Sequence, residues 1–288
     1  MKSGYISIIG KPNVGKSTLL NRLLEFKLSI VTAKPQTTRK RILGILTEGE
    51  HQCYFLDTPG LIDPGYELQE YMVAHIKNAV NDADIIIWVI DPWFKKDEYP
   101  KVFLKAFQKK PVICAINKID LVDHSKLLSL IDTVRTLPVS EIIPLSALTG
   151  DGMDICKKTI YKYLPDGPFL YPEQEISDRP ERFFAAELIR EKVFELFGEE
   201  IPYSTCVLID EFKERSKGKD FIRATIYVER ASQKGIIIGK KGEALKKVGS
   251  RARRAIEQFL GRKVFLELWV KVKTKWRKNK KFLKELGY

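Results

Sequence analysis

The stretch that decides the fold lies at residues 5–18 and reads Tyr5-Ile6-Ser7-Ile8-Ile9-Gly10-Lys11-Pro12-Asn13-Val14-Gly15-Lys16-Ser17-Thr18. An apolar, β-branched run ends at Gly10, and a helix-like segment at residues 19–24 follows Thr18. The pattern GxxxxGKS between a strand and a helix is typical of a phosphate-binding loop. We therefore expect its backbone N–H groups and the N-terminal end of the helix to bind phosphate oxygens.

Each residue type in this loop has a chemical reason. Gly10 and Gly15 allow the backbone to curl around the phosphates. Lys16 is predicted to bridge the β- and γ-phosphates, and the Ser17 hydroxyl to bind Mg²⁺. A chance glycine-rich turn is the alternative, which the flanking strand and helix disfavour. The predicted nucleotide contacts here are Gly10, Lys11, Pro12, Asn13, Val14, Gly15, Lys16, Ser17 and Thr18.

Length and charge predict two domains with different partners. The chain has 288 residues, 44% of them hydrophobic, and a formal net charge of +13. Residues 201–288 hold 24 Lys and Arg against 9 Asp and Glu, whereas residues 1–200 are nearly neutral, with 26 against 28. The positive excess in the last third indicates a separate module that binds a polyanion.

The cysteines and the N-terminus indicate the compartment. Cys53, Cys114, Cys156 and Cys206 show no CxxC spacing, so we expect reduced thiols and neither disulfides nor zinc ligands. The chain opens on a predicted strand without a signal peptide, and no apolar run approaches the ~20 residues of a membrane span. We expect a soluble, cytoplasmic protein. The histidines suggest neither a metal site nor a catalytic triad.

A second motif follows a predicted hairpin. Strands at Ile42–Thr47 and Gln52–Asp57 are expected to pair antiparallel, and the second leads into Asp57-Thr58-Pro59-Gly60. The Asp57 carboxylate is predicted to hold Mg²⁺ through water, and Gly60 to offer its N–H to a γ-phosphate. Alone, this tetrapeptide is only a turn, but its place after a phosphate loop makes it a nucleotide motif.

Two further motifs select the base. A predicted strand at Pro111–Ile116 ends in Asn117-Lys118-Ile119-Asp120, and another at Ile142–Leu145 ends in Ser146-Ala147-Leu148. Asp120 can accept two hydrogen bonds from guanine, which adenine cannot donate, so the nucleotide is predicted to be GTP or GDP. Lys118 is expected to pack along the base, Asn117 to brace the loop, and the Ala147 N–H to meet the guanine oxygen. The remaining elements expected are helices Tyr71–Val80, Lys101–Gln108 and Ser125–Val134, and a buried strand Ile85–Ile90.

These four motifs resemble those of the translation-factor-like GTPases. The resemblance implies that Thr37 and Thr38 lie in a switch region that closes over Mg²⁺, with Thr38 favoured as the ligand. It makes Lys16, Thr38 and Gly60 the candidate catalytic residues, and Ser17, Thr37, Thr38 and Asp57 the candidate metal ligands. Leu61 stands where many small GTPases have a water-orienting glutamine, so slow intrinsic hydrolysis is expected. Asn13 resembles an asparagine that holds K⁺ in similar GTPases, although a local turn role is the alternative.

The last third predicts a second fold. Four prolines in Tyr163–Pro180 indicate a linker, with Ser177 or Asp178 expected to cap the next helix. The predicted elements are a helix Glu181–Phe197, strands Ser204–Lys213 and Phe221–Arg230, a glycine turn Gly239-Lys240-Lys241-Gly242 after an apolar helix end, a helix Glu243–Leu260 and a strand Val264–Lys273.

This order resembles a KH domain of type II, an α+β module whose GxxG turn lets single-stranded RNA approach the backbone. A simple helix–helix turn is the alternative for GxxG alone. The predicted RNA contacts are Ile237, Ile238, Gly239, Lys240, Lys241, Gly242, Lys246 and Arg251. Trp269 and Trp276 in the basic C-terminal segment are predicted to stack on bases. A solvated basic face and an amphipathic membrane-surface segment are alternatives.

Together, the motifs resemble the bacterial Era family over the whole chain. The implied fold is an α/β phosphate-loop GTPase domain (residues 1–170) with a mixed, mainly parallel six-stranded sheet and helices on both faces. A linker (171–180) and a KH domain (181–288) follow. The implied function is a slow, Mg²⁺-dependent GTPase switch in 30S ribosomal subunit assembly. It would bind the 3′ region of 16S rRNA as a monomer, with peripheral contact to the inner membrane as a further implied property.

Two other classes stay open. One is a GTP-dependent scaffold or regulator of another RNA or of the membrane surface, in which the nucleotide site is only a structural switch. The other is a related tRNA-modifying or ribosome-maturation GTPase with a different RNA, which should carry a C-terminal cysteine for modification chemistry or a second GTPase domain, and neither is present.

Overall fold

The computed structural model describes all 288 residues, and they form two compact units. The first comprises residues 1–29, 38–63 and 72–178, and the second comprises residues 30–37, 64–71 and 179–288. Two short segments from the N-terminal part of the chain therefore belong to the C-terminal unit.

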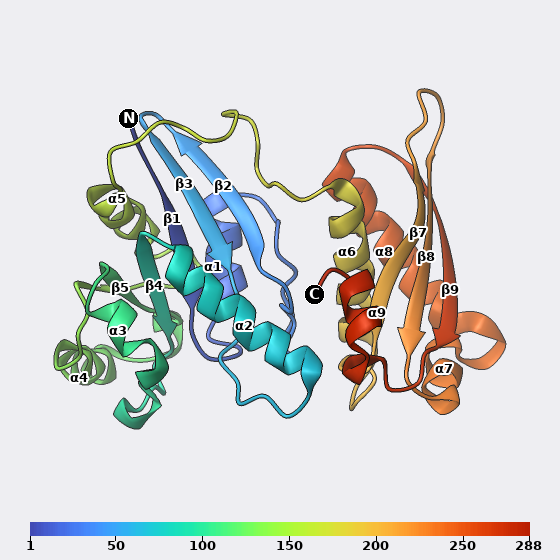
Figure 1. Ribbon diagram of the computed structural model, residues 1–288, viewed down its shortest axis with the longest axis horizontal. Helices are drawn as coiled ribbons and strands as arrows, with labels where there is room; N and C mark the ends of the chain where they lie inside the picture. Colours follow the sequence, from blue (N-terminus) through green and yellow to red (C-terminus); the bar gives the residue numbers. More distant parts are fainter. The chain divides into compact units, whose positions relative to one another are not determined.

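The first unit is built on a six-stranded sheet in the order β2-β3-β1-β4-β5-β6 (Figure 1). Five strands run parallel, and β2 is antiparallel to β3. This confirms the predicted mixed, mainly parallel sheet. Parallel strands end at one edge, so the loops after β1, β3, β5 and β6 gather there. The strands are β1 (Lys2–Ile9), β2 (Ile42–Glu48), β3 (His51–Asp57), β4 (Ile85–Ile90), β5 (Val112–Ile116) and β6 (Glu141–Pro144).

Helices cover both faces of this sheet. On one face α1 (Lys16–Leu24) packs on β1, β2 and β3 and beside α5 (Met153–Tyr163). On the other face α2 (Glu67–Asp82), α3 (Leu104–Phe107) and α4 (His124–Arg135) share an apolar core with β4 and β5. All six residues of β4 are buried, as a central parallel strand requires.

Three local predictions for this part of the chain were wrong or incomplete. Helix α5 was not predicted, although Met153, Cys156 and Ile160 form a buried stripe at helical spacing. The predicted helix Lys101–Gln108 is a 3-10 turn, Lys101–Phe103, followed by the single turn α3. Ser177 does not cap the next helix, because its hydroxyl donates to the Leu43 carbonyl; that helix starts after Pro180 without a side-chain cap.

The second unit has the predicted KH order of elements. A three-stranded sheet, β7-β8-β9, pairs β7 with β8 antiparallel and β8 with β9 parallel. Helices α6, α7 and α8 contribute Leu188, Ile189, Ile237, Val248 and Ile256 to a core shared with the sheet. The elements are α6 (Glu181–Leu196), β7 (Cys206–Lys213), β8 (Asp220–Val228), α7 (Ala231–Ile238), α8 (Glu243–Leu260), β9 (Val264–Val272) and α9 (Lys280–Glu285).

The basic C-terminal segment folds back on this unit. Trp276 is 0% exposed, and its indole N–H donates to the Ser204 carbonyl at 2.8 Å. The prediction that Trp276 stacks on bases was therefore wrong. Trp269 is 52% exposed, so its side chain is accessible and stacking on bases stays a prediction for it. All four cysteines are buried free thiols. None of the helices has the length and apolar character to span a membrane.

Candidate functional sites

The phosphate loop joins β1 to α1 in a conformation that depends on glycine. Gly15 has φ 98° and caps α1 without any side-chain hydrogen bond. A Cβ at Gly15 would lie 2.1 Å from Asn117 Nδ2, so no larger residue fits. Since no side chain caps this end of the helix, its first N–H groups are available to an anion.

Lys16 is held inside the loop. Its side chain donates to the carbonyls of Gly10 at 3.1 Å and Lys11 at 2.8 Å. Burial lowers the pKa of Lys16 to about 8, and the nearby Asp57 carboxylate opposes this shift. A phosphate group at the loop would stabilise the ammonium form of Lys16.

A cluster of oxygen atoms lies beside Lys16 within the first unit. Asp57 Oδ2 accepts hydrogen bonds from the hydroxyls of Ser17 at 2.8 Å and Ser29 at 2.9 Å. The Ser17 hydroxyl lies 2.9 Å from that of Thr38. Asp57 is fully buried, yet its Oδ1 has no hydrogen-bond partner. A buried carboxylate oxygen without a partner, next to two hydroxyl oxygens, fits a hard cation such as Mg²⁺.

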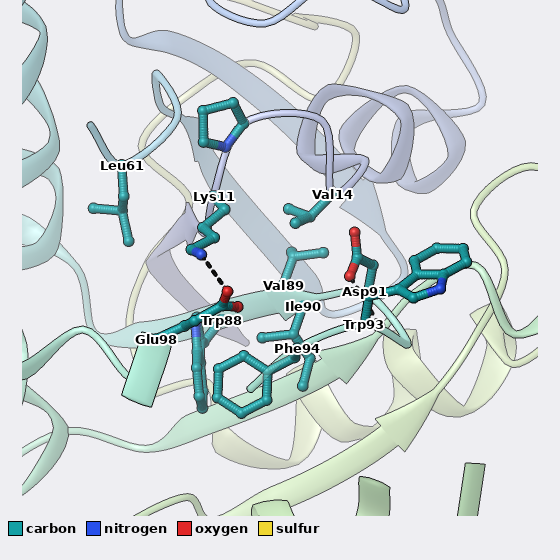
Figure 2. A pocket seen from close by; sticks show the side chains of 11 residues that line it. Lys11, Val14, Leu61, Trp88, Val89, Ile90, Asp91, Trp93, Phe94 and Glu98 are labelled. Atoms are coloured by element: carbon teal, nitrogen blue, oxygen red, sulfur yellow. Dashed lines mark hydrogen bonds and ion pairs between the residues drawn. The ribbon is translucent and has the colours of Figure 1, made fainter. Parts of the chain in front are cut away.

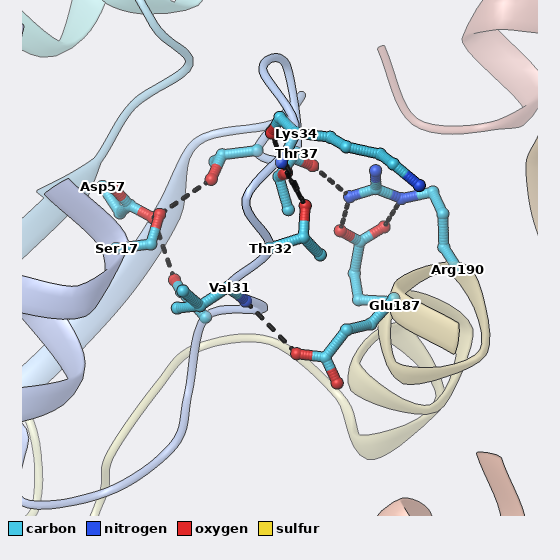
Figure 3. A network of polar contacts seen from close by, with 11 residues as sticks. Ser17, Val31, Thr32, Lys34, Thr37, Asp57, Glu187 and Arg190 are labelled. Carbon is cyan, nitrogen blue, oxygen red and sulfur yellow. Dashed lines mark hydrogen bonds and ion pairs between the residues drawn. The ribbon is translucent and has the colours of Figure 1, made fainter. Parts of the chain in front are cut away.

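Burial raises the pKa of Asp57, and hydrogen bonds from Ser17, Ser29 and Thr38 together with the charge of Lys16 act against that shift. A divalent cation would hold the carboxylate ionised. Thr37, the other threonine predicted as a candidate metal ligand, makes different contacts. The Thr37 hydroxyl donates to the Lys34 carbonyl at 2.7 Å and pairs with the Thr32 hydroxyl at 2.7 Å, both within the second unit (Figure 3).

The residues after β3 close against the phosphate loop. The Thr58 hydroxyl donates to the Ile8 carbonyl at 2.7 Å, and the Leu61 N–H donates to the Gly10 carbonyl at 3.0 Å. A Cβ on Gly60 would lie 2.7 Å from the Pro12 ring, so glycine is required at this close approach. Asp57, Thr58, Pro59 and Gly60 are all buried.

Leu61 occupies an apolar setting. It lines a cavity of about 190 Å³ beside the loop, and its side chain packs against the core cluster of Trp88 (Figure 2). On the same cavity Lys11 forms an ion pair with Glu98 at 2.7 Å, and this contact lowers the pKa of Glu98. No glutamine lines this cavity, so it offers no side chain of the kind that orients the attacking water in many small GTPases.

The base-selecting motifs are braced against the phosphate loop. Asn117 is buried; its amide donates to the Val14 carbonyl at 2.8 Å, and its oxygen accepts from the Ala147 N–H at 2.9 Å. Lys118 donates to the Asn13 carbonyl at 2.6 Å. Asp120 and Leu148 are exposed, whereas Ser146 is fully buried. The fold thus brings together the four motifs predicted from sequence, with the Asp120 carboxylate open to a ligand.

The GxxG turn lies between α7 and α8 and has left-handed backbone at Gly239 (φ 72°), Lys241 (φ 51°) and Gly242 (φ 80°). A groove of about 440 Å³ runs from this turn along α8 and β9. Of the predicted RNA contacts, Gly242 and Lys246 line the groove, and Lys240, Lys241 and Arg251 are exposed. Ile237 is 0% exposed in the core, so its side chain has no surface to offer an RNA, and Ile238 is partly buried.

Several site residues were not predicted. Ser29, the second donor to Asp57, lies in a loop without any sequence pattern. The floor of the groove could have been predicted from the sequence. The alternation of side chains along β9 puts Leu266 and Leu268 on one face, and helical spacing adds residues of α8. The groove residues outside the prediction are Leu245, Gly249, Ser250, Arg253, Leu266 and Leu268.

Comparison with known proteins identifies both parts. A family model described as 50S ribosome-binding GTPase matches residues 5–118, and the KH domain model matches residues 200–277. A GTPase Era from Lactobacillus helveticus is 46% identical over 290 aligned positions, which cover 100% of this chain and 96% of that protein. The chain belongs to the Era family. It is therefore a GTPase, as the motifs predicted.

Two solved Era structures resemble the chain over its whole length. A variant of Aquifex aeolicus Era bound to GDP·AlF₄⁻ has a TM-score of 0.94 at 45% identity and covers 100% of this chain and 99% of that one. An Era complex with MgGDPNP and nucleotides 1506–1542 of 16S rRNA has a TM-score of 0.95 at 44% identity, with the same coverage. Guanine nucleotide, Mg²⁺ and rRNA are thus ligands of Era proteins close to this chain.

Proposed function

We propose that this Era-family chain is a GTP-hydrolysing switch that binds the 3′ region of 16S rRNA and acts in assembly of the 30S subunit. The observation that carries the proposal is its full-length similarity to an Era bound to both MgGDPNP and nucleotides 1506–1542. Nucleotide chemistry is assigned to residues 1–170 and RNA binding to residues 181–288, with residues 171–180 as the linker.

In this proposal the first unit performs hydrolysis by positioning and charge and forms no covalent intermediate. Lys16 and the loop N–H groups bind the phosphates, and Gly60 offers its N–H to the γ-phosphoryl group. Ser17 and Thr38 would supply hydroxyl ligands for Mg²⁺, and Asp57 would hold the ion through a water molecule. The ion would neutralise negative charge on the phosphates. Support for Thr38 over Thr37 comes from the 2.9 Å contact between the Thr38 and Ser17 hydroxyls.

The apolar side chain of Leu61 cannot form a hydrogen bond that orients the attacking water, so we expect slow intrinsic hydrolysis. We assign to Asn13 the binding of K⁺, whose charge would add to that of Lys16 in the transition state. The left-handed backbone of Asn13, with φ 64°, and its carbonyl bond to Lys118 also fit a purely local role. Turnover in K⁺ against Na⁺ separates the two: equal rates would remove the K⁺ assignment.

The RNA assignment rests on charge and shape in the second unit. The groove has an apolar floor of Leu245, Leu266 and Leu268 and basic side chains from Lys246 and Arg253. Such a groove suits splayed bases on its floor and phosphates at its rim. Gly239 cannot become alanine without strain, because a Cβ there would lie 2.6 Å from that of Ala244.

A pair of variants tests both assignments. Asp120→Asn should weaken GTP binding and favour xanthosine triphosphate, because an amide presents a donor where guanine needs an acceptor. Leu268→Glu should weaken binding of an RNA copying nucleotides 1506–1542. The matched control Leu128→Glu changes a leucine of α4 that is 61% exposed and is not among the residues that line the groove. Unchanged RNA affinity in Leu268→Glu would refute the groove.

A scaffold whose nucleotide site only switches conformation is the second candidate. One experiment distinguishes this scaffold from the hydrolysing switch. A variant that binds GTP but cannot hydrolyse it would keep the function of a scaffold in cells and lose that of the switch. We place the protein in the cytoplasm as a monomer. Peripheral contact with the inner membrane, which the basic C-terminal segment would make, is tested by flotation with anionic vesicles.

A further inference from the structure

The segment that precedes Thr38 is anchored on helix α6 of the second unit, to which residues 30–37 belong. Ile30 is 2% exposed in the core that contains Leu188 and Ile189 of α6. The Val31 N–H donates to Glu191 Oε1 at 3.2 Å, and the Lys34 ammonium binds the carbonyls of Phe194 and Phe197 at the end of the helix. The segment thus has apolar and polar attachments along one helix.

The last attachment is a buried arginine. Arg190 is 2% exposed, and its Nη2 donates to the Thr37 carbonyl at 2.6 Å. Its Nε donates to Glu187 Oε1 at 3.1 Å, and Nη2 also binds Glu187 Oε2, so the carboxylate fixes the plane of the guanidinium (Figure 3). Nη1 is buried and has no hydrogen-bond partner among the protein groups.

The next residue along the chain is Thr38, whose hydroxyl lies 2.9 Å from that of Ser17 in the first unit. The carbonyl of Thr37 is part of the peptide bond that ends at Thr38. Because that bond is planar and rigid, the position of the Thr37 carbonyl restricts where the Thr38 side chain can lie. A bond made by α6 is therefore transmitted to the candidate metal ligand through the backbone.

We propose that Arg190, oriented by Glu187, is a positioning residue for GTP hydrolysis. It holds the Thr37 carbonyl so that the Thr38 hydroxyl stays beside Ser17 and Asp57 when the γ-phosphate and metal are bound. The inference rests on the proposed role of Thr38. In the proposed function Thr38 binds the metal when the γ-phosphate is present, so we expect the arginine to act on triphosphate binding and on turnover and to leave GDP binding unaffected. Binding energies are reciprocal, so a ligand that displaces α6 also changes the affinity for GTP.

Arg190→Met in the full-length protein tests the proposal. We expect the single-turnover rate of GTP hydrolysis to fall about 10- to 100-fold, since an error of about 1 Å at a reacting group has that effect. Affinity for GDPNP should fall about 5-fold or more, whereas GDP affinity stays within about twofold. Arg190→Lys, which keeps the charge but cannot hold Glu187 and Thr37 together, should lie between these values. Arg182→Met is the matched control: Arg182 is on the same helix and donates to the Ile209 carbonyl at 2.9 Å.

Two further variants keep the outcomes distinct. If Thr38→Ala hydrolyses GTP at the wild-type rate, the proposed metal role of Thr38 fails. If Thr38→Ala is slow and Arg190→Met is not, only the positioning role fails. Equal loss of GDP and GDPNP affinity in Arg190→Met would mean a merely structural arginine and would also overturn the inference. Should Arg190→Met not fold, Glu187→Gln releases the guanidinium with a smaller change, and a wild-type rate there would refute the proposal.

Discussion

Substitution of Asn117 by alanine should weaken guanine-nucleotide binding strongly, although Asn117 need not touch the nucleotide. Its side chain connects the phosphate loop to the loop after β6 through bonds to the Val14 carbonyl and the Ala147 N–H, and it is 3% exposed. Alanine leaves both partners buried and unsatisfied, each at about 1–3 kcal/mol. With about 1.5 kcal/mol for each, the two loops lose about 3 kcal/mol of mutual stabilisation, which corresponds to a roughly 150-fold weaker Kd if all of it falls on binding.

The assay is a titration with fluorescent GDP, accompanied by thermal unfolding of the nucleotide-free protein. Asn81→Ala serves as the control, because Asn81 is an exposed residue of α2. A drop of at least about 30-fold in GDP affinity, with the control unchanged, is the expected result. If GDP affinity in Asn117→Ala stays within about twofold of wild type, the brace does not hold the site and the reasoning is refuted.

Four further outcomes follow from buried groups. Lys16 has a pKa of about 8 without nucleotide, so GDP binding at pH 8 should take up about half a proton, and clearly less at pH 7.3, as calorimetry in buffers of different ionisation enthalpy would reveal. The lowered pKa also fixes the sign of the contribution of Lys16 to folding: in the nucleotide-free protein, the stability difference between wild type and Lys16→Met should shift in favour of wild type as pH rises from about 8 towards 10.5, and a shift the other way would contradict it. Burial raises the pKa of Cys53 and Cys156 to about 12, so the native protein should not react with a thiol reagent at pH 8, whereas the denatured chain should show four thiols. Trp276→Ala should lower the free energy of unfolding by about 3–5 kcal/mol in urea titrations, and a change under about 1 kcal/mol would mean that the C-terminal segment is not packed.

The nucleotide motifs were predictable because each lies at the end of a strand and its residue types have few other uses. The phosphate and metal chemistry that we propose for Gly15, Lys16 and Asp57 allows few other residue types, so a local pattern is sufficient to select them as candidates. The sheet followed from the same segments, since apolar runs such as Ile85–Ile90 are typical of central parallel strands.

Contacts between distant residues were not predictable. Both Thr37 and Thr38 are buried threonines in one polar loop, and only the fold shows that Ser17 lies beside the hydroxyl of Thr38. The packing of residues 30–37 was not predictable for the same reason: they look like a loop of the first domain, but Ile30 packs among residues more than 150 positions away. Trp276 stands in a run of lysines that predicts exposure, yet one hydrogen bond to Ser204 and a buried site outweigh that local signal.

The rate of GTP hydrolysis with and without RNA is the decisive test of a switch that links the nucleotide site to RNA binding. The full-length protein would be assayed in K⁺ and Mg²⁺ with an RNA copying nucleotides 1506–1542 of 16S rRNA, with a scrambled RNA, and as the groove variant Leu268→Glu. We expect that only the matching RNA accelerates hydrolysis and that the groove variant loses this acceleration. Equal rates with matching, scrambled and no RNA would contradict a switch that couples the two units.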